Sequence, residues 1–319
     1  MVFIPLEPGV NIDANNSGPD CQVAAALGAK WVRVSLEQGA SAAHLQEVKT
    51  AATNNGLLLM NTCQPTGHVA PSTSAGMTAW GDYVGQFSTV CDLTGTGNEP
   101  ANFGGKFTPQ QYAQMMLAAI AGRDKAGGGR LLTPEMAPGY DDPAKNIYTE
   151  PVGWICRMFD AEPTILKAKK LWAGWHGYCD GRWNPNTAAL WNTCYQQRTL
   201  QVQLKKRGAG GKKIVNGEMG VATGPSDWVQ KVSASDQALR LQQWLEECHN
   251  QESVGVVHGP WFWFQLRDRA PMSDWTLCSG LIDIHGAVKP SGEMFKTLAA
   301  AAPALVVKPT VQDVPTTAV

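Results

Sequence analysis

The sequence predicts a single-domain (β/α)8 barrel, the TIM-barrel architecture, and three observations predict it. Eight short apolar runs recur along the chain, helical apolar stripes lie between them, and no G-x-G-x-x-G or P-loop motif is present. The 319 residues are enough for such a barrel, which typically takes about 250. A doubly wound open sheet is the alternative, and it usually carries a glycine-rich phosphate loop after its first strand.

The apolar runs indicate strands. They begin near residues 9–12, 31–34, 57–60, 92–94, 130–132, 171–175, 213–215 and 255–257. From the third run onward they lie about 35 to 43 residues apart. That spacing suits a unit of one strand, one helix and two loops.

Helices are predicted between these runs. Apolar residues recur at helical spacing in 45–52, 80–87, 112–120 and 241–248. Thr108 and Pro109 form a helix start signal, an N-cap followed by proline. Residues 303–319 are rich in Pro, Thr and Val without a helical stripe, so we expect a barrel domain over 1–302 and then a tail or the start of a linker.

Bulk charge and hydropathy exclude some classes of partner. The net charge of −1 gives no electrostatic reason to bind nucleic acid or an anionic membrane. No apolar run approaches the roughly 20 residues that span a bilayer. The stretch 1–8 lacks the basic and apolar regions of a signal peptide. We expect a monomer that acts outside the cell, as a mature secreted form or carried by a phage particle.

The eight cysteines contain no C-x-x-C pair, so the usual zinc and thioredoxin signatures are missing. His176 and Cys179 are the nearest thing to a ligand pair. We expect mostly buried thiols, with one or two disulfides left open. The sequence predicts no metal site and no cofactor.

Two glutamate motifs carry the strongest chemical signal. Gly97-Asn98-Glu99-Pro100 follows the fourth predicted strand, and Gly217-Glu218-Met219-Gly220 follows the seventh. Active sites of these barrels lie at the carboxyl ends of the strands. Strands four and seven lie on opposite sides of the barrel, so Glu99 and Glu218 are expected to face each other over its mouth. Two facing carboxyl groups are the equipment for cleaving a glycosidic bond.

Other side chains with chemical potential stand at the ends of neighbouring strands. Glu135, after strand five, is a spare catalytic candidate. Tryptophan is frequent in this chain, and its flat apolar face suits a sugar ring. The remaining candidates for substrate binding or support are Arg33, Asn98, His176, Tyr178, Trp263 with Trp261 as its rival, and Trp175 and Trp183 for further subsites.

Together these elements resemble the glycoside hydrolases of clan A. The Asn-Glu-Pro after strand four, the His-x-Tyr after strand six and the tryptophan of strand eight carry the likeness. The Gly-Glu-x-Gly after strand seven is most similar to family 5, the cellulase and mannanase group. Residues 26–33, which end in Arg33, resemble the clan's second strand. The likeness extends to about residue 300 and implies a (β/α)8 fold.

The resemblance implies a role for each matching residue. Glu218 would be the nucleophile of a double displacement, and Glu99 the general acid and then the base. The supporting roles would be divided as follows: Arg33 keeps Glu218 ionised, Tyr178 hydrogen-bonds it, His176 sits near Glu99, Asn98 holds the sugar 2-hydroxyl, and Trp263 forms the floor of the cleaved sugar's subsite.

One element departs from the family pattern. Family 5 members usually carry a histidine after strand three, whereas this chain has Asn61-Thr62-Cys63-Gln64-Pro65-Thr66-Gly67-His68. Either His68 takes that role or the role is absent.

The sequence is therefore compatible with three functions. The leading one is a retaining, endo-acting glycoside hydrolase that cleaves a β-linked oligo- or polysaccharide, in the manner of a cellulase. The others are a carbohydrate-binding barrel without turnover, such as a host-recognition component of a virion, and a transglycosylase.

Overall fold

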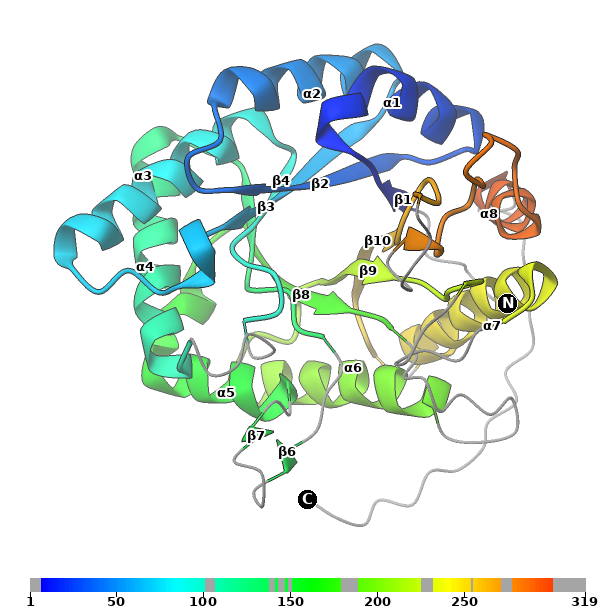
Figure 1. The fold of residues 1–319 in the computed structure, drawn as a ribbon. Helices are drawn as coiled ribbons and strands as arrows, with labels where there is room; N and C mark the ends of the chain where they lie inside the picture. Colours follow the sequence, from blue (N-terminus) through cyan, green and yellow to red (C-terminus); the bar gives the residue numbers. More distant parts are fainter. Residues whose placement is uncertain are drawn as a thin grey trace.

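The computed structural model describes residues 7–100, 107–137, 141–142, 147–148, 151–178, 189–224, 232–253, 255–270 and 277–300. Within them, eight parallel strands close into a barrel in the order β1-β10-β9-β8-β5-β4-β3-β2, and helices surround it (Figure 1). The predicted (β/α)8 barrel is therefore confirmed. A two-stranded antiparallel ribbon, β6 (Asp141–Asp142) and β7 (Ile147–Tyr148), stands apart from the barrel sheet.

The predicted runs fall on the barrel strands. These are β1 (Pro8–Asn11), β2 (Trp31–Glu37), β3 (Leu58–Gln64), β4 (Leu93–Gly95), β5 (Arg130–Leu132), β8 (Leu171–His176), β9 (Ile214–Met219) and β10 (His258–Trp263). The last strand begins at His258 rather than near 255. Gly255 adopts a φ of +93°, a conformation typical of a turn, so the preceding turn reaches further along the chain than the apolar pattern suggested.

The helices form the outer layer of the molecule (Figure 1). Their bounds are α1 (Ser17–Ala26), α2 (Ala42–Asn54), α3 (Ser74–Val90), α4 (Pro109–Ala126), α5 (Pro151–Ala161), α6 (Ala189–Lys206), α7 (Ala234–Ser253) and α8 (Pro290–Ala300). The predicted start of α4 is confirmed, because the Thr108 hydroxyl accepts from the backbone of Gln111 in a capping box. No helix among the described residues is both long and apolar enough to cross a membrane.

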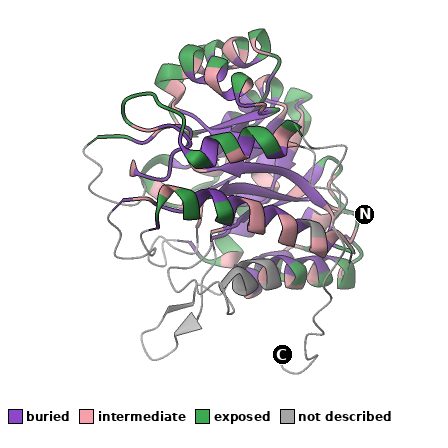
Figure 2. Cartoon of the chain, turned by 90° about the vertical axis from the view of Figure 1, so that its right-hand side faces the viewer, coloured by how far each residue is buried: buried purple, intermediate pink, exposed green. Residues whose placement is uncertain are grey.

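The apolar core has two parts. The larger part lies between the strands and the helices, where the inward-facing surfaces are buried (Figure 2). A smaller cluster of Trp31, Met60, Leu93, Leu132, Val215 and Phe262, with Trp172 against it, fills the barrel interior. Side chains of a strand alternate between its two faces. Residues two positions further along therefore face the interior nearer the carboxyl ends, and they include Arg33, Thr62, Gly95 and Gly217. The barrel changes there from apolar packing to a polar layer.

The six described cysteines, Cys21, Cys63, Cys91, Cys156, Cys248 and Cys278, are buried, in agreement with the prediction of buried thiols. Burial raises the pKa of the Cys21 thiol to about 11 and that of Cys91 to about 12. The side chains of Cys179 and Cys194 lie outside the described residues, as does the expected tail at 303–319. The domain boundary, the monomeric state and the compartment stay predictions.

Candidate active site

Glu99 stands in a loop whose shape is fixed by its neighbours. Gly97 has a φ of +152°, and a Cβ at that position would collide with the hydroxyl of Tyr112, so the motif requires glycine there. The Glu99 amide donates to the Glu135 carbonyl over 2.8 Å, and the Glu135 amide donates to the Gly97 carbonyl over 2.9 Å. Glu99 itself has a φ of +47°, a conformation uncommon outside glycine that concentrates at functional sites.

An irregularity in β9 sets the direction of the Glu218 side chain. Asn216 pairs with Trp175 on β8, but the next pair along β8 joins His176 to Glu218, so one residue of β9 is skipped. Such a bulge changes the face that the following side chain takes. Asn11 supports it, because its Nδ2 donates to the carbonyls of Gly217 at 3.1 Å and Trp263 at 3.3 Å.

The two glutamates meet at the mouth of the barrel. Carboxylate oxygens of Glu99 and Glu218 and a ring nitrogen of His176 all lie within 4.8 Å of one another. The side chain of Glu99 is 21% exposed and that of Glu218 is 12% exposed. Both carboxyl groups are therefore open to a substrate while resting against buried protein.

Arg33 connects the polar layer beneath them. Its Nη1 donates to Glu218 Oε1 at 2.7 Å, and its Nη2 donates to Asn98 Oδ1 at 3.0 Å. Its Nε lies 3.1 Å from Glu135 Oε2. Burial lowers the pKa of Arg33, but the two glutamates outweigh it and raise the value above its usual range. Arg33 is thus a permanent cation beside Glu218.

His176 and Tyr178 complete the contacts. Nδ1 of His176 lies 2.6 Å from Glu99 Oε1 and 3.6 Å from Glu218 Oε2, while its Nε2 lies 3.3 Å from Glu135 Oε2. Burial lowers the pKa of His176, but the surrounding carboxylates outweigh it and raise the value to about 10. The Tyr178 hydroxyl donates to Glu218 Oε2 at 2.7 Å, and burial raises its pKa well above the ordinary value.

The triad of Glu99, His176 and Glu218 has the spacing of a metal-ligand group. Its donor set does not suit a metal. Both ring nitrogens of His176 lie within hydrogen-bonding distance of carboxylates, and these carboxylates raise its pKa to about 10, which favours the doubly protonated ring. A doubly protonated imidazole has no lone pair to offer a cation. The group is better described as a hydrogen-bonded cluster of ions.

The sequence-based placement of Trp175 and Trp263 at the substrate site is wrong. Phe262 points into the barrel, so by alternation Trp261 and Trp263 point outward into the layer under the helices, where both are buried. The Trp263 indole donates to the Ser279 carbonyl at 2.8 Å. Trp175 is also fully buried in that outer layer. Neither Trp175 nor Trp263 offers a face to a sugar.

Phe264 takes the position at the mouth that was assigned to Trp263. Its ring centroid lies 6.2 Å from that of Tyr178, and it lines a pocket of about 270 Å³ beside Arg33 and Glu218. The other polar groups of this pocket are Asn11, Asp13, Asn15, Ser35, Gln265 and Arg269. The period-two alternation from Phe262 was the sequence signal that could have identified Phe264.

Two further sequence predictions can be placed. Trp183 lies outside the described residues. His68 faces Glu37, with its Nε2 3.5 Å from Glu37 Oε1. The interior position of β3 next to Arg33 is held by Thr62, whose hydroxyl accepts from Arg33 Nε at 3.1 Å. A small side chain at that position leaves room for Glu135.

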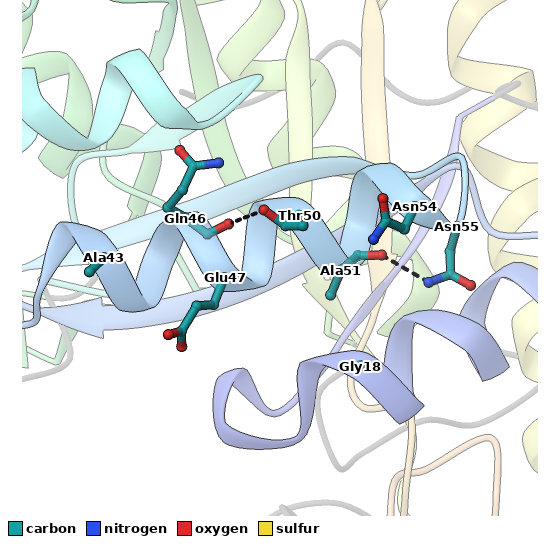
Figure 3. A pocket seen from close by; sticks show the side chains of 8 residues that line it. All are labelled: Gly18, Ala43, Gln46, Glu47, Thr50, Ala51, Asn54 and Asn55. Carbon is teal, nitrogen blue, oxygen red and sulfur yellow. Dashed lines mark hydrogen bonds between the residues drawn. The ribbon is translucent and has the colours of Figure 1, made fainter.

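A second hollow lies on the outside of the barrel. It runs between α1 and α2 and is lined by Gly18, Ala43, Gln46, Glu47, Thr50, Ala51, Asn54 and Asn55 (Figure 3). Two of its polar side chains are engaged by their own helix, since Thr50 donates to the Gln46 carbonyl and Asn55 Nδ2 to that of Ala51. It does not include any of the clustered carboxylates, so the barrel mouth is the candidate active site.

No protein-family model and no curated protein matches this sequence, whereas solved structures match its fold. A family 39 glycoside hydrolase from Bacteroides cellulosilyticus WH2 gives a TM-score of 0.69 at 14% identity, over 97% of this chain and 66% of that chain. A variant of GH5_18 from Bifidobacterium longum subsp. longum, in complex with Manβ1-4GlcNAc, gives 0.66 at 15% identity, over 95% and 80%. GH5_18 from Streptomyces cattleya, in complex with GlcNAc, gives 0.63 at 16%, over 97% and 83%.

The chain has the fold of these glycoside hydrolases. That finding agrees with the resemblance to clan A and family 5 in the sequence. The chain spans just under two thirds of the length of the family 39 structure, at 66%. At identities of 14–16% the likeness concerns the fold, and the chemistry must be argued from the side chains.

Proposed function

We propose that this protein is a retaining glycoside hydrolase acting on β-linked glycans. The observation that carries the proposal is the spacing of Glu99 and Glu218, which each place one carboxylate oxygen within 4.8 Å of the other. Retaining enzymes hold their carboxyl groups about 5–5.5 Å apart, and inverting enzymes about 6.5–9.5 Å to admit a water molecule. The spacing supports attack by one carboxylate on the sugar itself.

The surroundings support one assignment of roles. Glu218 accepts from Arg33 on Oε1 and from Tyr178 on Oε2, which suits a group that must be ionised to act as nucleophile. Glu99, with the more exposed side chain, would protonate the leaving oxygen. In the second step it would take a proton from the water that hydrolyses the glycosyl-enzyme ester.

Whether cleavage occurs within a glycan chain or at its end is a separate question. The sequence-based argument for endo-action relied on tryptophans, and Trp175 and Trp263 are buried. We therefore propose hydrolysis of a β-linked glycan and leave endo-action as a prediction. Loss of viscosity of a polysaccharide ahead of the release of reducing ends would support it.

The test uses two variants and one control. Aryl β-glycosides, Manβ1-4GlcNAc and a panel of wall polysaccharides serve as substrates. Glu218→Ala should lose turnover and recover it with azide, giving an α-configured glycosyl azide. Glu99→Ala should keep partial activity on good leaving groups, which need little acid assistance. Glu47→Ala, on the exposed face of α2, should behave as the parent.

Two results would contradict the proposal. Parent-like hydrolysis by both active-site variants would exclude the assigned roles. Saccharide binding by the parent without turnover on any substrate would favour a binding barrel instead. Products longer than the substrate would indicate that a sugar hydroxyl replaces water as acceptor, the transglycosylase alternative.

A further inference from the structure

Glu135 is a carboxylate enclosed by protein below the proposed catalytic pair. Its side chain has no exposed surface, so a bound saccharide cannot reach it. Its Oε1 accepts from the Thr62 hydroxyl at 2.5 Å. Its Oε2 lies 3.1 Å from Arg33 Nε and 3.3 Å from His176 Nε2. Glu135 therefore touches the two cations that in turn touch Glu99 and Glu218.

Three neighbouring strands leave space for this side chain. A Cβ at Gly95 would lie 2.7 Å from Glu135 Oε1, and one at Gly174 would lie 2.9 Å from Glu135 Cγ. A Cβ at Gly217 would collide with Glu135 Oε2. Burying a carboxylate is unfavourable unless cations and hydrogen bonds offset the loss of water. Burial alone raises the pKa of Glu135, but Arg33 and His176 outweigh it and lower the pKa below its ordinary value.

His176 is placed to serve both catalytic carboxylates. Its Nδ1 lies 2.6 Å from Glu99 Oε1 and 3.6 Å from Glu218 Oε2. In the proposed first step a Glu218 oxygen bonds to the anomeric carbon, the glycosidic bond breaks, and the Glu99 proton passes to the leaving oxygen. Glu218 changes from carboxylate to neutral ester while Glu99 changes from acid to carboxylate. A fixed cation between them stabilises the negative charge on whichever carboxylate carries it.

We propose that Glu135 is a positioning residue that keeps His176 doubly protonated. The Nδ1–H group of His176 is then a counter-ion for each of the two catalytic carboxylates in turn. This inference rests on the function proposed above. The charges support it. While Glu99 holds its proton, the carboxylates of Glu135 and Glu218 balance the cations of Arg33 and His176. Without Glu135 one positive charge is in excess, and His176 is the cation that can release a proton, because Arg33 cannot.

The groups around His176 set the direction of the pH effect. They are Glu99 after β4, Glu135 after β5, Tyr178 after β8 and Glu218 on β9, with Arg33 of β2 beyond Glu135. Of these, only the carboxylates raise the pKa of His176. Neutralising Glu135 therefore lowers the pKa of His176. His176 then loses its proton at a lower pH than in the parent, and activity is lost at that lower pH.

The first measurement is made on the parent protein. The side-chain nitrogens of His176, assigned by their loss in His176→Gln, are followed by ¹⁵N NMR across the pH range. We expect both to carry protons in the parent at about pH 8, well above the ordinary histidine pKa of about 6.5. Deprotonation of His176 in the parent below about pH 8 would overturn the proposal.

The second measurement compares Glu135→Gln with the parent. We expect the His176 titration and the basic limb of the kcat/KM profile to move down together by about one pH unit or more, with activity recovering on the acidic side. Glu135→Asp keeps the charge and should keep the limb in place, even with a lower kcat. Glu47→Gln is the control, because it removes a carboxylate 3.5 Å from His44 on the outer helix.

The outcomes separate the two proposals. A Gln variant with the parent profile, or an Asp variant that shifts as far as the Gln variant, would overturn the role of Glu135. If Glu135→Gln does not fold, the NMR of the parent and the Asp variant still decide. Absence of turnover in the parent defeats the proposed function, whereas the protonation of His176 is measured regardless of activity.

Discussion

The Tyr178 hydroxyl donates a 2.7 Å hydrogen bond to Oε2 of Glu218, while the guanidinium of Arg33 occupies Oε1. Each oxygen of the proposed nucleophile thus has its own donor, from β2 on one side and from the end of β8 on the other. The carboxylate is held in one orientation by groups that stay protonated across the working pH range, because the pKa values of both donors are raised.

Tyr178→Phe removes one of these donors without a change of shape. A hydrogen bond to a charged group contributes about 1.5–3 kcal/mol, so kcat should fall about tenfold to hundredfold. Since Tyr178 holds Glu218 rather than the sugar, KM should change little. Steady-state kinetics on an aryl β-glycoside check this, and an unchanged kcat would show that the contact does not matter to the reaction.

Arg33→Lys should be far from conservative. The guanidinium contacts Glu218, Glu135 and Asn98 in directions that a single ammonium group cannot reproduce. Breaking buried pairs costs about 3–5 kcal/mol, which urea unfolding would measure. Arg207→Lys, at the exposed pair with Asp160, is the matched control and should cost less than about 1 kcal/mol. Equal losses for both variants would contradict the buried network.

Stability should decline on the alkaline side of neutrality. The folded protein raises the pKa of His176 from 6.5 to about 10, so the protonated ring contributes its full stability below about pH 6.5. That contribution is lost as pH rises through about 10. The melting temperature of the parent should fall as pH rises from about 6.5 to about 10. The His176→Gln variant should lack the part of this pH dependence that comes from the histidine.

Gly217→Ala tests why glycine precedes Glu218. The added Cβ would collide with Glu135 Oε2, and overpacking of this kind costs about 1–3 kcal/mol. Activity should fall as well, because Glu135 and the bulge both shift. Gly211→Ala, where a Cβ meets nothing within 4 Å, should stay within about 0.5 kcal/mol of the parent. Thermal melts and kcat values of the two variants distinguish a steric clash at Gly217 from an effect common to any glycine replaced by alanine.

Chelation should leave hydrolysis unchanged. The ring nitrogens of His176 are taken by carboxylates, which leaves no ligand from this histidine for a cation at the cluster of Glu99 and Glu218. Activity before and after treatment with a chelator is the measurement. Loss of activity that added divalent metal restores would show that the cluster binds an ion.

The fold and the two acidic motifs could be predicted from the sequence because both are local signals. Apolar runs at regular spacing mark strands, and glycine or proline around Glu99 and Glu218 marks the loops that follow them. Positions at the ends of β2, β4, β8 and β9 then follow from barrel topology alone. Arg33, His176 and Tyr178 were found in this way, and their contacts with the two glutamates are present in the structure.

Only the tertiary structure decided which faces the side chains take and how deep they lie. The bulge in β9 and the outward direction of Trp263 depend on pairing between strands far apart in sequence, and a shift of one residue exchanges inside for outside. The depth of Glu135 depends on glycines from three different strands. Local sequence patterns do not encode these long-range contacts, because burial and charge pairing are properties of the closed barrel as a whole.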